Sequence, residues 1–277
     1  MSGWAIEVRV PPGSRAATAV RLVEWTDVAV EERPDGTLVS FAPTAAETET
    51  LLARLKEAVP SGLQTTCTHI ETTDWLLRWR DGLAPRQIGR LTIVPSWLHP
   101  DTSPPERTVI LDPGGAFGSG EHGSTRAALG LLERLVPPGA VVLDLGSGSG
   151  ILAIAALAIG ARQAIGIDVD EQAVEVAEAN ARRNGVAHAV SFLTGDARML
   201  VPLLGPVDCV VANILRTVNT ALLPIIHGSL RADGVAVFSG MEEEEAAEFL
   251  AALADARFDV VEQRTDDGWW AVAAKPR

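Results

Sequence analysis

The sequence predicts an α/β protein in which a doubly wound, seven-stranded sheet follows a small N-terminal α+β domain of ferredoxin-like type. Two observations lead to this fold class. From about residue 109 onward, apolar strand-like runs alternate with helical segments, which is the rhythm of a mostly parallel sheet with helices on both faces. The first 71 residues instead give the shorter order β-α-β-β-α-β. The 277 residues are 47% hydrophobic and 21% charged, as in ordinary globular proteins, so a sizeable buried core is expected.

Turn and cap signals divide the N-terminal domain into its elements. Pro34-Asp35-Gly36 has the turn chemistry of a hairpin. Thr44 and Glu47 stand at the spacing of a capping box, which predicts that a helix begins there. The expected elements are a strand over 4–10, a helix over 14–24, a strand ending near 33, a strand over 37–41, a helix to about 58 and a strand ending at 71.

We expect a linker over 72–105, because this segment continues neither pattern. Trp75 and Trp79 stand four residues apart, so in a helix they share one face. They either pack the small domain against the large one or contact the substrate. The segment ends in the proline-containing stretch 99–105, which is typical of a loop. The predicted domains are therefore 1–71 for substrate recognition, the linker 72–105 and the large domain 106–277.

The large domain has seven strand signals. They lie at 141–145, 164–168, 190–193, 207–212, 235–239, 258–264 and 269–274, with helices expected from 151, over 170–184, near 217–230 and near 242–255. The run Thr265-Asp266-Asp267-Gly268 joins the last two strands, and its turn chemistry predicts an antiparallel hairpin at the sheet edge.

A glycine-rich turn follows the first of these strands. Gly146, Gly148 and Gly150 let the backbone approach a ligand without obstruction by a Cβ atom, and Asp144 precedes them. A dinucleotide site requires G-x-G-x-x-G to receive a pyrophosphate. Here the third glycine comes one residue early, and Asp144 would repel phosphate but attract a cation. The turn therefore favours S-adenosylmethionine over a dinucleotide.

Two acids follow the next strands of the large domain. Asp168 lies 18 residues after Gly150 at a strand end, where its carboxylate can accept hydrogen bonds from both ribose hydroxyls. Its structural alternative is to cap the following helix, which Asp170 can already do. Asp196 stands where it could meet the adenine amino group, or it could simply form a turn.

Methyl transfer from a sulfonium depends mainly on positioning, because the donor is already activated and leaves as a neutral thioether. Asn213 ends a buried strand at the edge where open α/β sheets bind ligands, and its side-chain carbonyl could accept from an incoming amine. A turn-forming asparagine is the alternative. We therefore predict Asn213 as a residue that positions the amine and contacts the cofactor, with no strong general base.

The stretch 114–125 contains five glycines among twelve residues and leads into a helix. This composition predicts either a loop that closes over the cofactor or a plain linker. Thr125 or Ser124 could donate to the carboxylate end of the cofactor near the helix N-terminus, with an N-cap role for Ser124 as the alternative. His122 is a further catalytic candidate, although a single histidine is more often structural.

Charge and cysteine content narrow the partners. The 23 basic and 36 acidic residues give a net charge of −13, which argues against binding to nucleic acid phosphates and permits attraction to a basic protein. Cys67 and Cys209 form no metal-ligand pattern, so no metal is expected. We find no signal sequence and no apolar stretch long enough to span a membrane, and we expect a cytoplasmic monomer.

Three segments together resemble a known family. They are the run 112–125, the run 143–154 around the glycine turn, and Val211-Ala212-Asn213-Ile214-Leu215. These segments are similar to those of the bacterial methyltransferases of large-subunit ribosomal protein eleven, the PrmA family of class I methyltransferases. The resemblance implies methylation, often trimethylation, of lysine side chains and of the N-terminal α-amine of that protein. It also implies Thr125, Gly146, Asp168 and Asn213 as ligands of S-adenosylmethionine.

Three other functions compete with this one. A class I methyltransferase could act on another protein amine or amide. A dehydrogenase that uses NAD would need a turn that accepts pyrophosphate, which Gly150 and Asp144 disfavour. An RNA-binding module would need basic and aromatic residues on the ferredoxin-like sheet, where the sequence instead has residues such as Ile6, Val8 and Val39.

Overall fold

The computed structural model describes residues 2–11, 14–26, 30–33, 35–59, 62–71, 83–98 and 107–277. These residues form two compact units, one within Met1–Gly82 and the other within Leu83–Arg277. In the described parts of the chain, no helix is both long enough and apolar enough to cross a bilayer.

The first unit is a four-stranded sheet in the order β2-β3-β1-β4, and the pairs β1/β3, β1/β4 and β2/β3 are antiparallel. Its elements are β1 (Ser2–Arg9), α1 (Arg15–Thr26), β2 (Glu31–Glu32), β3 (Leu38–Ala42), α2 (Ala45–Ala58) and β4 (Gln64–Glu71). This order confirms the predicted ferredoxin-like arrangement. Ile6, Leu22 and Leu55 are fully buried between the sheet and the two helices.

One half of the predicted capping box at the start of α2 is observed. The Glu47 backbone N–H donates to Thr44 Oγ1 at 3.2 Å, and Thr44 Oγ1 lies 2.7 Å from the Glu47 carboxylate. The helix therefore begins where the sequence indicated, because the Thr44 side chain satisfies a backbone N–H of its first turn and the Glu47 carboxylate accepts from the Thr44 hydroxyl.

The second unit contains a seven-stranded sheet in the order β10-β9-β8-β11-β12-β14-β13. Its strands are β8 (Val141–Leu145), β9 (Gln163–Asp168), β10 (Val190–Thr194), β11 (Val207–Asn213), β12 (Leu230–Glu242), β13 (Phe258–Asp266) and β14 (Trp269–Pro276). The pairs from β10 to β12 are parallel, and β12/β14 and β13/β14 are antiparallel. The predicted sheet and its edge hairpin are both confirmed.

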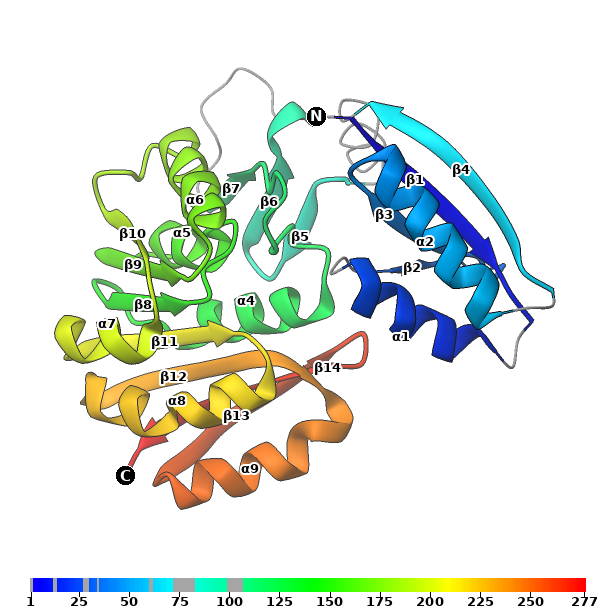
Figure 1. The fold of residues 1–277 in the computed structure, drawn as a ribbon. Coiled ribbons are helices and arrows are strands. Elements are labelled where there is room, and N and C mark those ends of the chain that lie inside the picture. The colour runs from blue at the N-terminus through cyan, green and yellow to red at the C-terminus, as the bar shows by residue number, and fades with distance from the viewer. Residues whose placement is uncertain are drawn as a thin grey trace. The chain divides into compact units, whose positions relative to one another are not determined.

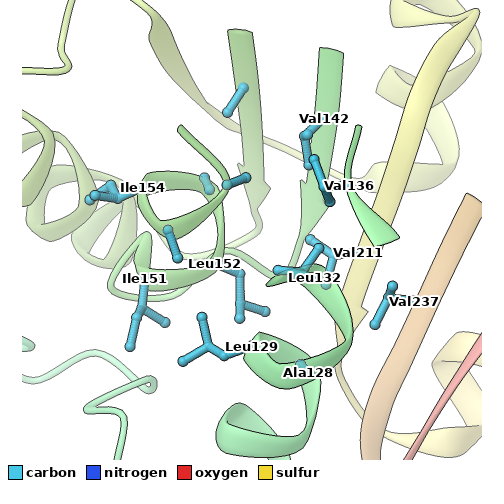
Figure 2. Close-up of a cluster of buried hydrophobic side chains, with 14 of the residues drawn as sticks. Ala128, Leu129, Leu132, Val136, Val142, Ile151, Leu152, Ile154, Val211 and Val237 are labelled. Atoms are coloured by element: carbon cyan, nitrogen blue, oxygen red, sulfur yellow. The ribbon is translucent and has the colours of Figure 1, made fainter. Parts of the chain in front are cut away.

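Helices cover both faces of this sheet (Figure 1). On one face lie α4 (Gly123–Leu135), α5 (Ile151–Ala158) and α6 (Glu171–Arg183), and on the other lie α7 (Ala197–Leu204), α8 (Arg216–Ser229) and α9 (Ala246–Asp255), the last preceded by the 3-10 turn η3 (Glu243–Glu245). In Figure 2, Leu129 and Leu132 of α4 and Leu152 of α5 gather beside Val211 and Val237 of the central strands. This double covering explains the nearly continuous apolar runs of the parallel strands.

A separate three-stranded sheet, in the order β5-β6-β7, belongs to the same unit. It consists of β5 (Arg86–Ile88), β6 (Leu91–Pro95) and β7 (Thr108–Leu111), with the 3-10 turn η2 (Ser96–Leu98) after β6. The segment 72–105, for which we expected a linker, is described only over 83–98. This part forms β5, β6 and η2, and it buries Ile88, Leu91 and Ile93 in the core beneath α4 and α5. The expected helix with Trp75 and Trp79 lies outside the described residues.

Helix α7 was not predicted. It has only eight residues and contains Pro202. Asp196 caps it by accepting from the Arg198 backbone N–H at 2.8 Å. A short helix with an internal proline gives little periodic signal, so its position is set by the packing of Val201 into the core.

Candidate functional site

The glycine turn joins the end of β8 to the start of α5. Gly146, Gly148 and Gly150 all have positive φ angles, of 70°, 50° and 79°. A Cβ atom on Gly148 would lie 2.5 Å from the carbonyl oxygen of Phe117, so a side chain there is excluded by backbone as well as by conformation. The backbone N–H of Gly146 donates to the carbonyl of Ile167 at 2.8 Å, which fixes the turn against β9.

Asp168 lies beside this turn, at the end of β9. Parallel pairing of Leu145 with Ile167 brings the two strand ends together. The Asp168 carboxylate is half-buried and accepts from the backbone N–H of Gly148 at 2.8 Å and of Asp170 at 3.0 Å. These two bonds orient the carboxylate, and each of its oxygens keeps a further lone pair for a ligand hydroxyl.

Asp144 is fully buried beneath the turn and does not line an open surface. Its Oδ2 accepts from the backbone N–H of Ala153 at 3.0 Å, whereas Oδ1 has no hydrogen-bond partner. Burial raises the pKa of Asp144 to about 7, and the negative charge of Asp168 adds to this increase. The structure thus places a carboxyl group that titrates near neutrality directly under the glycines.

Asn213 and Thr125 meet where β11 ends against α4. Asn213 Nδ2 donates to Thr125 Oγ1 at 3.2 Å, and Thr125 is fully buried. The side-chain oxygen of Asn213 is buried without a partner, as is the hydroxyl of Ser147 in the glycine turn. Together with Asp144 Oδ1, these atoms leave three unsatisfied buried oxygens around the turn, an arrangement that suits a ligand bearing N–H donors and positive charge.

His122 lies at the N-cap position of α4, and its Nδ1 is 2.7 Å from the hydroxyl of Ser124. Its ring is packed against Trp269, with ring centroids 4.2 Å apart, and against Phe117 at 5.3 Å. Burial, and next the charge of Arg126, lower the pKa of His122, so the imidazole is neutral at pH 7. A neutral ring in this position can accept a proton and holds no fixed charge.

Asp196 is placed differently from the other candidates. It caps α7, and its carboxylate also pairs with the guanidinium of Arg198. The Arg198 hydrogen bonds hold the pKa of Asp196 below its usual value. Both oxygens are therefore engaged locally, which is the cap or turn role that the sequence left open.

The structure adds two residues that the sequence analysis missed. Ser149 donates its backbone N–H to the carbonyl of Phe117 at 2.9 Å and its hydroxyl to the carbonyl of Gly118 at 2.6 Å. It thereby joins the glycine turn to the stretch 112–125, which we call the glycine-rich segment. Trp269 reaches His122 from the first position of β14. Neither role has a sequence signal, because each partner lies far away in the chain.

Comparison with known proteins identifies the family. A family model described as ribosomal protein L11 methyltransferase (PrmA) matches residues 16–277. The chain belongs to this family. The resemblance inferred from the three sequence segments is therefore confirmed.

Individual members of the PrmA family show how far the similarity extends. The ribosomal protein L11 methyltransferase of Pelotomaculum thermopropionicum is 39% identical over 230 residues, which cover 83% of this chain and 73% of that protein. That of Pseudomonas putida (strain GB-1) is 42% identical over 209 residues, covering 75% and 70% of the two chains. The crystal structure of a ribosomal protein L11 methylase from Lactobacillus delbrueckii subsp. bulgaricus is 32% identical with a TM-score of 0.62, covering 70% of this chain and 100% of that one.

Proposed function

We propose that this PrmA-family chain transfers methyl groups from S-adenosylmethionine to ribosomal protein L11, on lysine side chains and on the N-terminal α-amine. The observation that carries the proposal is the glycine turn with Asp168 at the neighbouring strand end, in a chain whose relatives are named ribosomal protein L11 methyltransferase. Bound S-adenosylmethionine would supply a methyl group that is already activated by its positive sulfur.

The residues around the turn fit such a cofactor. The three glycines give the turn its positive φ angles and its close packing against neighbouring segments, and Asp168 is oriented to accept from the ribose hydroxyls. The unsatisfied buried oxygens of Asp144 and Ser147 provide negative character beneath a cationic ligand. We do not assign Asp196 to the adenine, since its carboxylate is already committed to Arg198 and to the start of α7.

Positioning of the amine is assigned to Asn213. Its side-chain oxygen lacks a partner, and the Thr125 hydroxyl fixes the orientation of the amide by accepting from Nδ2. The oxygen could accept a hydrogen bond from an N–H of the incoming amine and so keep the lone pair of the amine nitrogen directed toward the methyl group. His122, neutral at pH 7, is a secondary candidate to receive the proton that the amine loses.

The charge of the chain suits this substrate. A net charge of −13 attracts a basic ribosomal protein and repels RNA phosphates, so we propose no direct binding to nucleic acid. We assign docking of the substrate to the ferredoxin-like unit, and we propose a monomer that acts in the cytoplasm, where ribosomal proteins are made.

The test combines labelling with cofactor binding. Purified L11 and radiolabelled S-adenosylmethionine should give labelled L11 with the wild type, and calorimetry should show that Asp168→Ala raises the Kd of the cofactor at least about tenfold. Asp208→Ala is the matched control, because Asp208 also accepts a backbone N–H, that of Val141 at 2.7 Å, but at the opposite end of β8. Cofactor binding without labelling of L11 would overturn the substrate, and an unchanged Kd in Asp168→Ala would overturn the site.

A further inference from the structure

The edge of β7 that faces away from β6 is paired with the side chains of a helix. β7 is the last strand of the three-stranded sheet, so one row of its backbone groups has no strand partner. Asn184 Oδ1 accepts from the N–H of Ile110 at 2.8 Å, and Asn184 Nδ2 donates to the carbonyl of Ile110 at 2.7 Å. Asn180 does the same for Asp112, at 2.9 Å and 3.0 Å.

The spacing of the two amides matches the spacing of the strand. Residues four apart on a helix are separated by about 6 Å along its axis, and alternate residues of a strand by about 6.8 Å. Alternate residues of a strand also direct their N–H and C=O groups to the same side. Asn180 and Asn184 therefore act toward Asp112 and Ile110 as a neighbouring strand would.

Asn180 makes one contact that Asn184 does not. Its Nδ2 also donates to the carbonyl of Ser149 in the glycine turn, at 2.9 Å. Ser149 in turn holds Phe117 and Gly118 by two hydrogen bonds. Asn180 thus fixes the first residue of the stretch 112–118, and Ser149 fixes its last two. Asn180 and Ser149 are in turn hydrogen-bonded to each other.

The Asn180 side chain is fully buried, and all of its hydrogen-bonding groups are used. Its oxygen accepts from Asp112 and from Arg183, and its amide donates to Asp112 and to Ser149. Because the side chain is fully buried, its removal would leave its backbone partners in the turn and in the glycine-rich segment without these hydrogen bonds.

We propose that Asn180 is a positioning residue that couples the glycine-rich segment to the cofactor turn, so that S-adenosylmethionine meets both as one preorganised surface. This inference rests on the proposed function. In it, Asn180 does not touch the cofactor; it fixes Ser149, through which Phe117 and Gly118 keep their place over the turn.

Asn180→Ala is the test and Asn184→Ala is its matched control. Asn180 lies in the last turn of α6 and Asn184 is its C-cap. Each variant removes one amide and frees one backbone partner, Asp112 directly after β7 or Ile110 within it, but only the first releases Ser149. We expect Asn180→Ala to raise the Kd of S-adenosylmethionine about tenfold and to accelerate hydrogen exchange at the Ser149 amide. In Asn184→Ala the Kd should stay within about twofold of the wild type, although the midpoint of thermal unfolding should fall about as far as it does in Asn180→Ala.

The outcomes separate this inference from the proposed function. If the wild type binds no S-adenosylmethionine by calorimetry, the proposed function fails and this inference fails with it. If the wild type binds and the two variants change the Kd equally, or not at all, only the coupling role is overturned. If Asn180→Ala does not fold, Ser149→Ala replaces it as the test, because this variant removes only the side-chain hydrogen bond to Gly118. Ser149→Ala should also raise the Kd of S-adenosylmethionine, and an unchanged Kd would refute the coupling.

Discussion

Replacing Asp144 by asparagine should make the protein more stable at alkaline pH. Asparagine has the shape of aspartate, and its oxygen can still accept the hydrogen bond from the Ala153 backbone N–H. What the substitution removes is a negative charge on a side chain with no exposed surface, one of whose oxygens has no partner. The folded protein must bear the cost of ionising this group, whereas the unfolded chain ionises it in water.

The size and sign of the effect follow from the pKa. The folded-state pKa of Asp144 is about 7, against an ordinary value of 3.8. Because the folded state binds this proton more tightly, the stability it contributes is fully present below about pH 3.8 and is lost as pH rises toward 7. At 1.36 kcal/mol per pKa unit the whole loss is about 4 kcal/mol, which is an upper estimate for the gain of Asp144→Asn at pH 8.

Urea unfolding of the wild type and of Asp144→Asn at pH 5 to 8.5 measures this difference. The free energy of unfolding of the variant, minus that of the wild type, should grow from pH 5 to about 7 and level off above the folded-state pKa of Asp144. Asp208→Asn is the control, since its half-buried carboxylate is paired with Arg231 and accepts from Val141. A variant less stable than the wild type by the same amount at every pH would refute the burial argument.

The pH dependence of cofactor binding should also reveal the ionisation of Asp144. A cationic cofactor above Asp144 favours its ionised form, so the affinity of the wild type for S-adenosylmethionine should rise as pH increases through about 7. In Asp144→Asn this dependence should be absent. Parallel pH profiles in calorimetry would show that the carboxyl group does not act on the cofactor.

Two further predictions concern the turn and the hairpin. Gly148→Ala combines a φ of +50° with a clash against Phe117, so it should lower the free energy of unfolding in urea by about 3 kcal/mol or more. Gly139→Ala is the control, because φ there is +80° but no atom lies within 4 Å of the added Cβ, and it should cost only about 1 kcal/mol. Equal costs would contradict the close approach of Phe117 to Gly148. Arg126→Met removes the partner of Asp266 in a mostly buried ion pair and should lower the free energy of unfolding by about 2 kcal/mol. A variant as stable as the wild type would show that this ion pair does not stabilise the β13–β14 hairpin.

Local patterns determined the parts of this protein that depend on neighbours in sequence. A helix begins at Thr44 because its side chain satisfies the Glu47 backbone N–H, which lies within the same turn. Gly146 and Gly148 adopt positive φ angles, as the turn after β8 requires. The alternation of strands and helices was enough to predict the doubly wound sheet, because each parallel strand needs a crossover of its own.

Only the tertiary structure decided where the polar groups of the site lie. In the sequence, Asp144 precedes the glycine turn and Asp168 ends the next strand, so both are acids near a strand end. In the structure, Asp144 is buried under the glycines, whereas Asp168 is oriented beside them. Asn180 meets Asp112 across 68 positions of sequence and Ser149 across 31. Burial and long-range hydrogen bonds depend on which elements pack together, and periodicity within one element contains no information about its partner across the core.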